Sequence, residues 1–159
     1  MNTLYLSLGT NMGDRQSNLD TAITLIASRI GTVCSISEAI RTEPWGFDSP
    51  SFFLNMAAQV LTGLTPFEVL HVTQDIERLM GRTEKSVNGH YHDRIIDIDL
   101  LMMTDADGND IIVNTRELTL PHRLMHLRKF VLEPLREIAP ELVHPLTGKT
   151  ISELSDSIE

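Results

Sequence analysis

Two aspartates lie two residues apart in an apolar stretch, at Asp97 and Asp99 in the segment Arg94-Ile95-Ile96-Asp97-Ile98-Asp99-Leu100. On a strand, alternate residues share a face, so both carboxylates point one way and the isoleucines point the other. Carboxylates held side by side repel each other unless a cation intervenes. Oxygen-only ligands favour Mg²⁺ over Zn²⁺, and Mg²⁺ often takes one or two carboxylates together with phosphate oxygens and water. The pair is therefore a candidate magnesium site for phosphoryl chemistry.

The alternative is that Asp97 and Asp99 form the solvated face of an amphipathic strand. Aspartate is a poor strand former, and its placement between β-branched residues favours a functional reason without deciding the matter.

Two arginines, Arg82 and Arg94, bracket a polar segment at residues 82–93, which we expect to be a long surface loop. Guanidinium groups placed there could hold a transferring phosphoryl group whose charge develops in the transition state. Most isolated surface arginines have no such role. Their closeness in sequence to the candidate metal site favours the functional interpretation.

The histidines suggest two further possibilities. The segment His90-Tyr91-His92-Asp93 superficially resembles a zinc cluster, but no cysteine or further histidine lies at a familiar ligand spacing. His122, which follows Pro121 and has Arg128 nearby, could bind a nucleotide phosphate, although an isolated histidine is more often structural.

A flat ring could be recognised by Phe53, Asn55 and Phe130. Aromatic faces can stack on a heterocycle, and an amide offers a donor and an acceptor to its edge. Such phenylalanines are core residues by default. Gly9-Thr10-Asn11-Met12-Gly13 lacks the Lys and Ser/Thr ending of a P-loop, so a P-loop nucleotide site is disfavoured.

The elements that position these residues follow from periodicity and capping signals. Asp14 and Thr65 are candidate helix caps, the second in a capping box with Glu68, for helices that end near Gly31 and Gly81. Strands are predicted at residues 4–8, 32–41, 52–61 and 94–103, with a hairpin return at 111–113. We expect Pro134 to interrupt the helix that follows Pro121. We expect the C-terminal tail to be peripheral. The fold class is predicted to be α+β, with the helices on one face of the sheet.

Composition predicts one domain over residues 1–159. A formal charge of -9 disfavours nucleic acid as a partner. Cys34, the single cysteine, is expected to be buried, and one unpaired cysteine fits a reducing cytoplasm. No segment has the length and apolarity of a membrane span or leader, so we expect a cytoplasmic protein without a membrane partner. We also expect the chain to be a monomer.

Six motifs in order resemble the 6-hydroxymethyl-7,8-dihydropterin pyrophosphokinases of folate biosynthesis. The similarity runs from Leu4 to about Pro145, and it is carried by the following segments: Leu8-Gly9-Thr10-Asn11, Arg41-Thr42-Glu43-Pro44, Phe53-Leu54-Asn55-Met56-Ala57, Gly81-Arg82, Arg94-Ile95-Ile96-Asp97-Ile98-Asp99 and Leu120-Pro121-His122.

The resemblance implies a ferredoxin-like α+β sandwich, with a mainly antiparallel sheet, packed helices and three active-site loops at residues 9–14, 43–51 and 82–93. ATP would donate its terminal pyrophosphate to the hydroxymethyl group of the pterin, and AMP would leave. Asp97 and Asp99 would hold two Mg²⁺ ions that bridge the phosphates.

Roles for other residues are likewise implied by the resemblance. Arg82 and Arg94 match the catalytic arginines of the family. The ATP-side positions are Glu77, Lys85, His122 and Arg128, and the pterin-side positions are Thr42, Trp45, Phe53, Asn55 and Phe130. Tyr91 stands where a tryptophan can occur, Glu84 interrupts a segment that can be more basic, and Arg123 receives no role.

Two rival functions stay open. One is a nucleotidyltransferase that uses the same carboxylate pair, and the other is a noncatalytic ligand-sensing domain in which the aspartates are surface residues.

Overall fold

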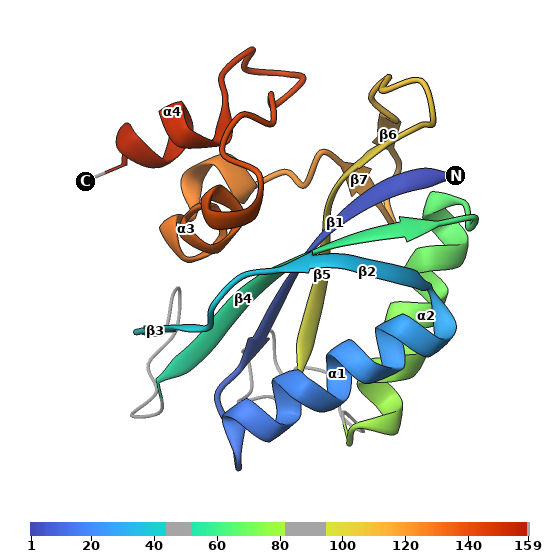
Figure 1. Cartoon of the computed structure of the whole chain (residues 1–159), viewed down its shortest axis with the longest axis vertical. Coiled ribbons are helices and arrows are strands. Elements are labelled where there is room, and N and C mark those ends of the chain that lie inside the picture. The colour runs from blue at the N-terminus through green and yellow to red at the C-terminus, as the bar shows by residue number, and fades with distance from the viewer. Residues whose placement is uncertain (44–51, 82–94, 159) are drawn as a thin grey trace.

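The computed structural model describes residues 1–43, 52–81 and 95–158. Its helices are α1 (Arg15–Arg29), α2 (Pro66–Leu79), α3 (Lys129–Ile138) and α4 (Ile151–Asp156), with a 3-10 turn at Met125–Leu127. Its strands are β1 (Asn2–Thr10), β2 (Gly31–Ile36), β3 (Ile40–Thr42), β4 (Phe53–Thr62), β5 (Asp97–Thr104), β6 (Val113–Asn114) and β7 (Thr119–Leu120). Figure 1 shows their arrangement.

The main sheet is antiparallel and has the order β2-β4-β1-β5, with β3 added beside β4. Strand β1 lies between β4 and β5, and its Leu4, Leu6 and Leu8 are fully buried on one face. β6 and β7 form a separate two-stranded sheet. The predicted α+β class with a mainly antiparallel sheet is confirmed.

Helices α1 and α2 begin at the predicted capping residues. The Asp14 carboxylate accepts the Ser17 N–H, and Thr65 and Glu68 form a reciprocal capping box. The apolar faces of both helices join the leucines of β1 in one core. Local signals therefore fix both helices, which cover one face of the sheet (Figure 1).

The other face of the sheet also carries helices, contrary to the expectation of a single covered face. Val131, Leu132 and Leu135 of α3 pack with Tyr5 and Ala57 in a second buried cluster. Figure 1 shows α3 and α4 across the sheet from α1 and α2. This second layer matters for the site because α3 holds Phe130 next to the sheet.

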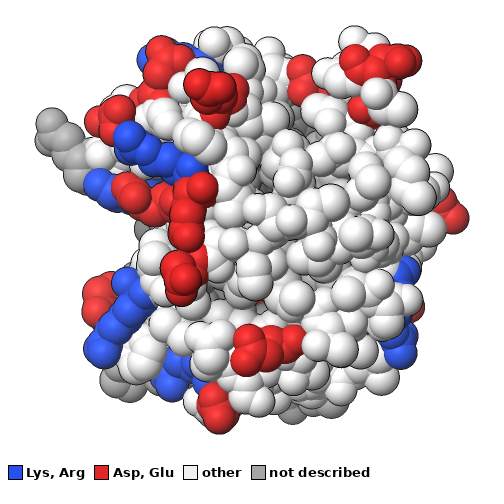
Figure 2. All heavy atoms as spheres, viewed as in Figure 1, with Lys and Arg blue, Asp and Glu red and all other residues white. Residues whose placement is uncertain are grey.

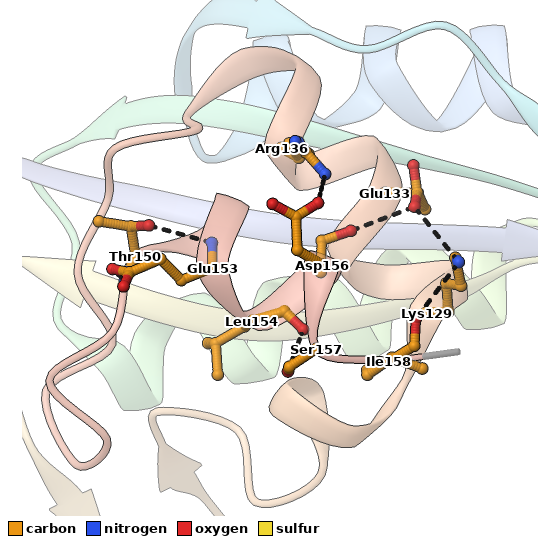
Figure 3. Close-up of polar contacts among 10 residues, drawn as sticks. Lys129, Glu133, Arg136, Thr150, Glu153, Leu154, Asp156, Ser157 and Ile158 are labelled. Atoms are coloured by element: carbon orange, nitrogen blue, oxygen red, sulfur yellow. Dashed lines mark hydrogen bonds and ion pairs between the residues drawn. The ribbon is translucent and has the colours of Figure 1, made fainter.

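Two predictions for the C-terminal region were wrong. Helix α3 runs through Pro134 without a break, because the buried face on which Pro134 lies stabilises the helix against the loss of one backbone bond. The tail is not peripheral, since α4 buries Ile151 and Leu154 against α3. In Figure 3, Arg136 and Asp156 form an ion pair between the two helices.

The strand boundaries differ from the predictions at several points. The strand expected at 32–41 is divided into β2 and β3, and the expected 94–103 strand begins at Asp97. After β5 the chain turns back as predicted, because the Ile111 N–H donates to the Met103 carbonyl and Asp110 bridges to Thr104. The paired residues confirm the hairpin.

Cys34 is exposed rather than buried. It lies where the pairing of β2 with β4 shifts register, so the alternation of inward and outward side chains is broken at this residue. Within the described part of the chain, every helix is too short or too polar to cross a membrane.

Candidate active site

Asp97 and Asp99 lie half-buried on β5 and alternate with the buried Ile98 and Leu100. This pattern confirms that the two carboxylates share a face of the strand. Both line a pocket of about 700 Å³, a size typical of small-molecule sites. Helix α2, residues 114–119 and 122–124, and Arg128 supply the other walls of this pocket.

The described residues assigned to the ATP side line the same pocket. Glu77 comes from α2, His122 from the segment after β7, and Arg128 from the residue before α3. Glu77 is buried, and its Oε2 accepts the backbone N–H of Ile98 at 2.9 Å. The fold thus brings together residues that lie far apart in the sequence.

His122 is held as a neutral ring by its surroundings. Its Nδ1 accepts the Leu124 N–H at 3.1 Å, which leaves Nε2 to carry the proton of the neutral ring. Burial, with help from the Arg128 guanidinium, lowers the pKa of His122 to about 4, although Asp97 acts in the opposite direction. At neutral pH the ring can therefore donate one hydrogen bond from Nε2 without carrying a charge.

The residues assigned to the pterin edge meet where β3 pairs with β4. The buried side-chain amide of Asn55 donates a hydrogen bond to the Thr42 hydroxyl. Thr42 lies opposite Phe53 in the strand pairing. Three of the predicted pterin residues are therefore neighbours.

Phe130 lies at the start of α3, and the Arg128 guanidinium is 5.6 Å from the centre of its ring. A cation at this distance is attracted by the face of an aromatic ring. Since Arg128 also lines the pocket, it connects the ATP-side residues with the second predicted aromatic ring.

The loop at residues 9–14 is tied to the sheet by Arg15. The guanidinium donates to the carbonyls of Asn11 and Phe52. It also stacks on the Phe52 ring, on which Arg41 stacks as well, at 4.0 and 3.9 Å from the ring centre. This contact fixes the start of β4, and with it Phe53 and Asn55.

The pocket has charged residues that sequence reasoning did not assign, namely Arg116, Glu117 and Arg123. Of these three, only Arg123 could have been suggested by the sequence, because it follows His122 directly. On the face shown in Figure 2, charged side chains lie mainly around the margins, with acidic and basic ones beside each other at the left, while other residue types make up most of the middle. Arg116, Arg123 and Arg128 thus bring positive charge to one pocket of a chain whose formal charge is -9.

Four of the predicted site residues lie outside the described part of the chain. These are Trp45, Arg82, Lys85 and Arg94, and the possible zinc ligands His90 and His92 lie outside it as well. Their roles stay predictions.

Residues 5–140 match the family model of 7,8-dihydro-6-hydroxymethylpterin-pyrophosphokinase (HPPK). The chain belongs to this family. A 2-amino-4-hydroxy-6-hydroxymethyldihydropteridine pyrophosphokinase of Porphyromonas gingivalis is 47% identical over 91% of this chain and 95% of its own length. The Bacillus subtilis enzyme of the same name is 37% identical over 92% of this chain and 84% of its own.

Solved HPPK-DHPS structures share the fold of this HPPK family member. One, described as a complex with substrates, superimposes with a TM-score of 0.75 at 17% identity and covers 98% of this chain. A Plasmodium falciparum HPPK-DHPS with STZ-DHP gives a TM-score of 0.74 at 18% identity over the same share of the chain. The present chain spans 43% of each of these longer chains, so the likeness in fold concerns less than half of their length.

Proposed function

We propose that the chain transfers the terminal pyrophosphate of ATP to the hydroxymethyl oxygen of 6-hydroxymethyl-7,8-dihydropterin and releases AMP, with magnesium held by Asp97 and Asp99. Membership of the HPPK family makes the chain a pyrophosphokinase of folate biosynthesis. The observation that carries the proposed site is the shared orientation of the two carboxylates into one pocket.

The donor set at β5 fits Mg²⁺ bound together with a nucleotide. Both candidate ligands are carboxylates, and the described residues contain no cluster of three or more His, Cys, Asp or Glu side chains able to hold a metal alone. Mg²⁺ commonly completes such a site with phosphate oxygens and water. Two Mg²⁺ ions bound there would neutralise phosphate charge and polarise the transferring group.

The protein groups around this site have complementary tasks. We assign His122 and Arg128 to the phosphates, as a neutral donor and a fixed cation. Thr42 and Asn55 would recognise the pterin edge, and Phe53 and Phe130 would stack on its faces. Trp45, Arg82, Lys85 and Arg94 are assigned by resemblance alone, with the two arginines stabilising the transferring charge.

The reaction brings the hydroxymethyl oxygen to the β-phosphorus of ATP. A bond forms between these two atoms and the hydroxyl proton is released. The bond between the β-phosphorus and the oxygen that bridges to the α-phosphorus breaks, so that AMP leaves with that oxygen. Catalysis of this kind depends on placing the two substrates in line and on stabilising spread negative charge.

The decisive experiment identifies the nucleotide product. The chain is incubated with Mg²⁺, ATP and 6-hydroxymethyl-7,8-dihydropterin, and we expect AMP and the pyrophosphorylated pterin in equal amounts. ADP as the product would contradict the proposal. AMP attached to the acceptor would favour the nucleotidyltransferase, and binding without turnover would favour the ligand-sensing domain.

We also expect the chain to act in the cytoplasm as a monomer. Light scattering in the presence and absence of ATP would measure its mass in solution.

A further inference from the structure

Strand β5 ends the sheet order β2-β4-β1-β5, so one edge of its backbone faces away from β1. Among the groups outside the main sheet that bond to β5, two belong to residues that line the pocket. The Ile98 N–H donates to Glu77 Oε2 at 2.9 Å, and the Leu101 carbonyl accepts the His122 N–H at 2.8 Å. A buried backbone donor without a partner is costly, so the Glu77 carboxylate takes the place of a neighbouring strand at Ile98.

Ile98 lies between the two candidate metal ligands. Because side chains alternate along a strand, the backbone position of Ile98 sets where the side chains of Asp97 and Asp99 begin and how they diverge. The residue of α2 that bonds the Ile98 N–H is therefore placed to influence the geometry of both carboxylates through the backbone.

Glu77 itself is an unusual residue for the C-terminal half of α2. It is 5% exposed, and burial of a carboxylate costs free energy unless hydrogen bonds compensate. It lines the pocket with Asp97 and Asp99, but among the described residues these acids do not form a three-ligand metal cluster. Its Ile98 bond thus accounts for its position better than direct metal binding does.

We propose that Glu77 is a positioning residue, whose carboxylate holds the Ile98 N–H and thereby sets the spacing of Asp97 and Asp99 for the metal ions. The metal part of this inference rests on the proposed function. It differs from an ATP contact at Glu77, which would affect nucleotide affinity and leave the β5 backbone unchanged.

Two substitutions of Glu77 distinguish the effect of side-chain length from the effect of charge. Glu77→Gln keeps an acceptor oxygen at the same distance along the side chain and removes the charge. Glu77→Asp keeps the charge and withdraws the acceptor by one methylene. The same pair at Glu68 is the matched control, because that carboxylate also accepts a backbone N–H, of Thr65 at 2.9 Å, at the other end of α2.

Two readouts are needed, and one requires no metal. The first is the Ile98 amide proton in the metal-free chain, measured by NMR chemical shift and hydrogen exchange. The second is the affinity for Mn²⁺ in the presence of the α,β-methylene analogue of ATP, measured by electron paramagnetic resonance. For Glu77→Asp we expect faster exchange at Ile98 and Mn²⁺ affinity lowered by about tenfold or more, the usual cost of losing an outer-shell partner.

Glu77→Gln is expected to leave both readouts close to those of the unsubstituted chain, and both Glu68 variants should leave Mn²⁺ affinity unchanged. The proposal is overturned if Glu77→Gln loses Mn²⁺ affinity as strongly as Glu77→Asp, since charge would then be decisive. Unchanged Mn²⁺ affinity in Glu77→Asp would overturn it as well. If the unsubstituted chain released no AMP, the proposed function would fail, while the amide and Mn²⁺ measurements would still judge the role of Glu77.

Discussion

Asn55 and Asp97 lie opposite the same residue, Gly9, on the two sides of strand β1. Directly opposed residues in an antiparallel sheet share a face, and neighbouring strands are about 4.8 Å apart. The predicted pterin amide and the predicted metal carboxylate therefore begin about 10 Å apart on one face of the sheet. In the proposed reaction, this separation would leave room for the hydroxymethyl group of the pterin to reach a phosphate held at the carboxylates.

Gly9 leaves the space that Asn55 occupies. A Cβ atom at residue 9 would lie 2.8 Å from Asn55 Oδ1 and 3.7 Å from Phe53 Cδ1. Gly9→Ala should therefore displace the Asn55 amide and raise the KM for the pterin by about tenfold, the effect of roughly 1.4 kcal/mol of lost binding. Steady-state kinetics with each substrate varied in turn would measure it.

Gly63→Ala is the matched control, because a Cβ atom there would meet no other atom within 4 Å. It should leave both KM values unchanged. Equal effects of the two alanines would show that the space beside Asn55 has no special importance.

The Thr42 hydroxyl holds the Asn55 amide in one orientation. Thr42→Val removes this acceptor while keeping the shape of the side chain, and we expect the KM for the pterin to rise about fivefold, in line with a hydrogen bond of about 1 kcal/mol. Thr42→Ser, which keeps the hydroxyl, should restore affinity. A serine variant as weak as the valine variant would contradict this explanation.

Asp97 and Asp99 should each be required for magnesium-dependent turnover. Asp97→Asn or Asp99→Asn weakens a ligand and is expected to slow AMP release by about a hundredfold or more, since metal stabilisation supplies several kcal/mol. The affinity for the pterin alone should change little. Asp107→Asn, at an exposed acid in the turn after β5, is the control, and a comparable loss there would show that general charge is responsible.

Helix α4 should contribute to global stability through Ile151, which is fully buried. Ile151→Ala is expected to lower the free energy of unfolding by about 2–5 kcal/mol, measured by urea denaturation. Val143→Ala, at a half-exposed position nearby, should cost less than about 0.5 kcal/mol. If Ile151→Ala changed the free energy of unfolding as little as Val143→Ala, the C-terminal tail would be peripheral to the stability of the fold.

The sequence predicts those features that local interactions decide. The caps at Asp14 and Thr65 need only residues three positions away, and the alternation around Asp97 is complete within a few residues. Helix α3 was mispredicted because Pro134 is unfavourable locally, while the packing that stabilises it comes from Tyr5 and Ala57, far away in the chain.

The contacts between residues of the candidate site could not be predicted from the sequence either. Nothing near Gly9 indicates that Asn55 fills the space beside it, since their pairing depends on the register of β1 and β4. The bond from Ile98 to Glu77 joins residues 21 positions apart on different elements. Motif resemblance assigned Glu77 to the site, but only the packing of α2 beside β5 shows what it holds.

Arg128 should contribute, after burial, to keeping His122 neutral. The folded-state pKa of His122 is lowered from 6.5 to about 4, first by burial and then by the Arg128 guanidinium. Because the folded value lies below the unfolded one, the unfolded chain binds the proton more readily between these pH values. The stability that neutral His122 contributes is therefore complete above pH 6.5 and is lost as the pH falls toward about 4.

Arg128→Gln should raise the pKa of His122 toward its ordinary value, which an NMR titration of the imidazole resonances would measure. The loss of folding stability at acidic pH should then be confined to a narrower pH range. Arg123→Gln is the comparison, because Arg123 acts in the same direction but more weakly than Arg128. If the pKa of His122 rose more in Arg123→Gln than in Arg128→Gln, the larger charge effect would belong to Arg123, and the prediction would be wrong. An unchanged pKa in both variants would leave burial as the sole cause of the neutral ring.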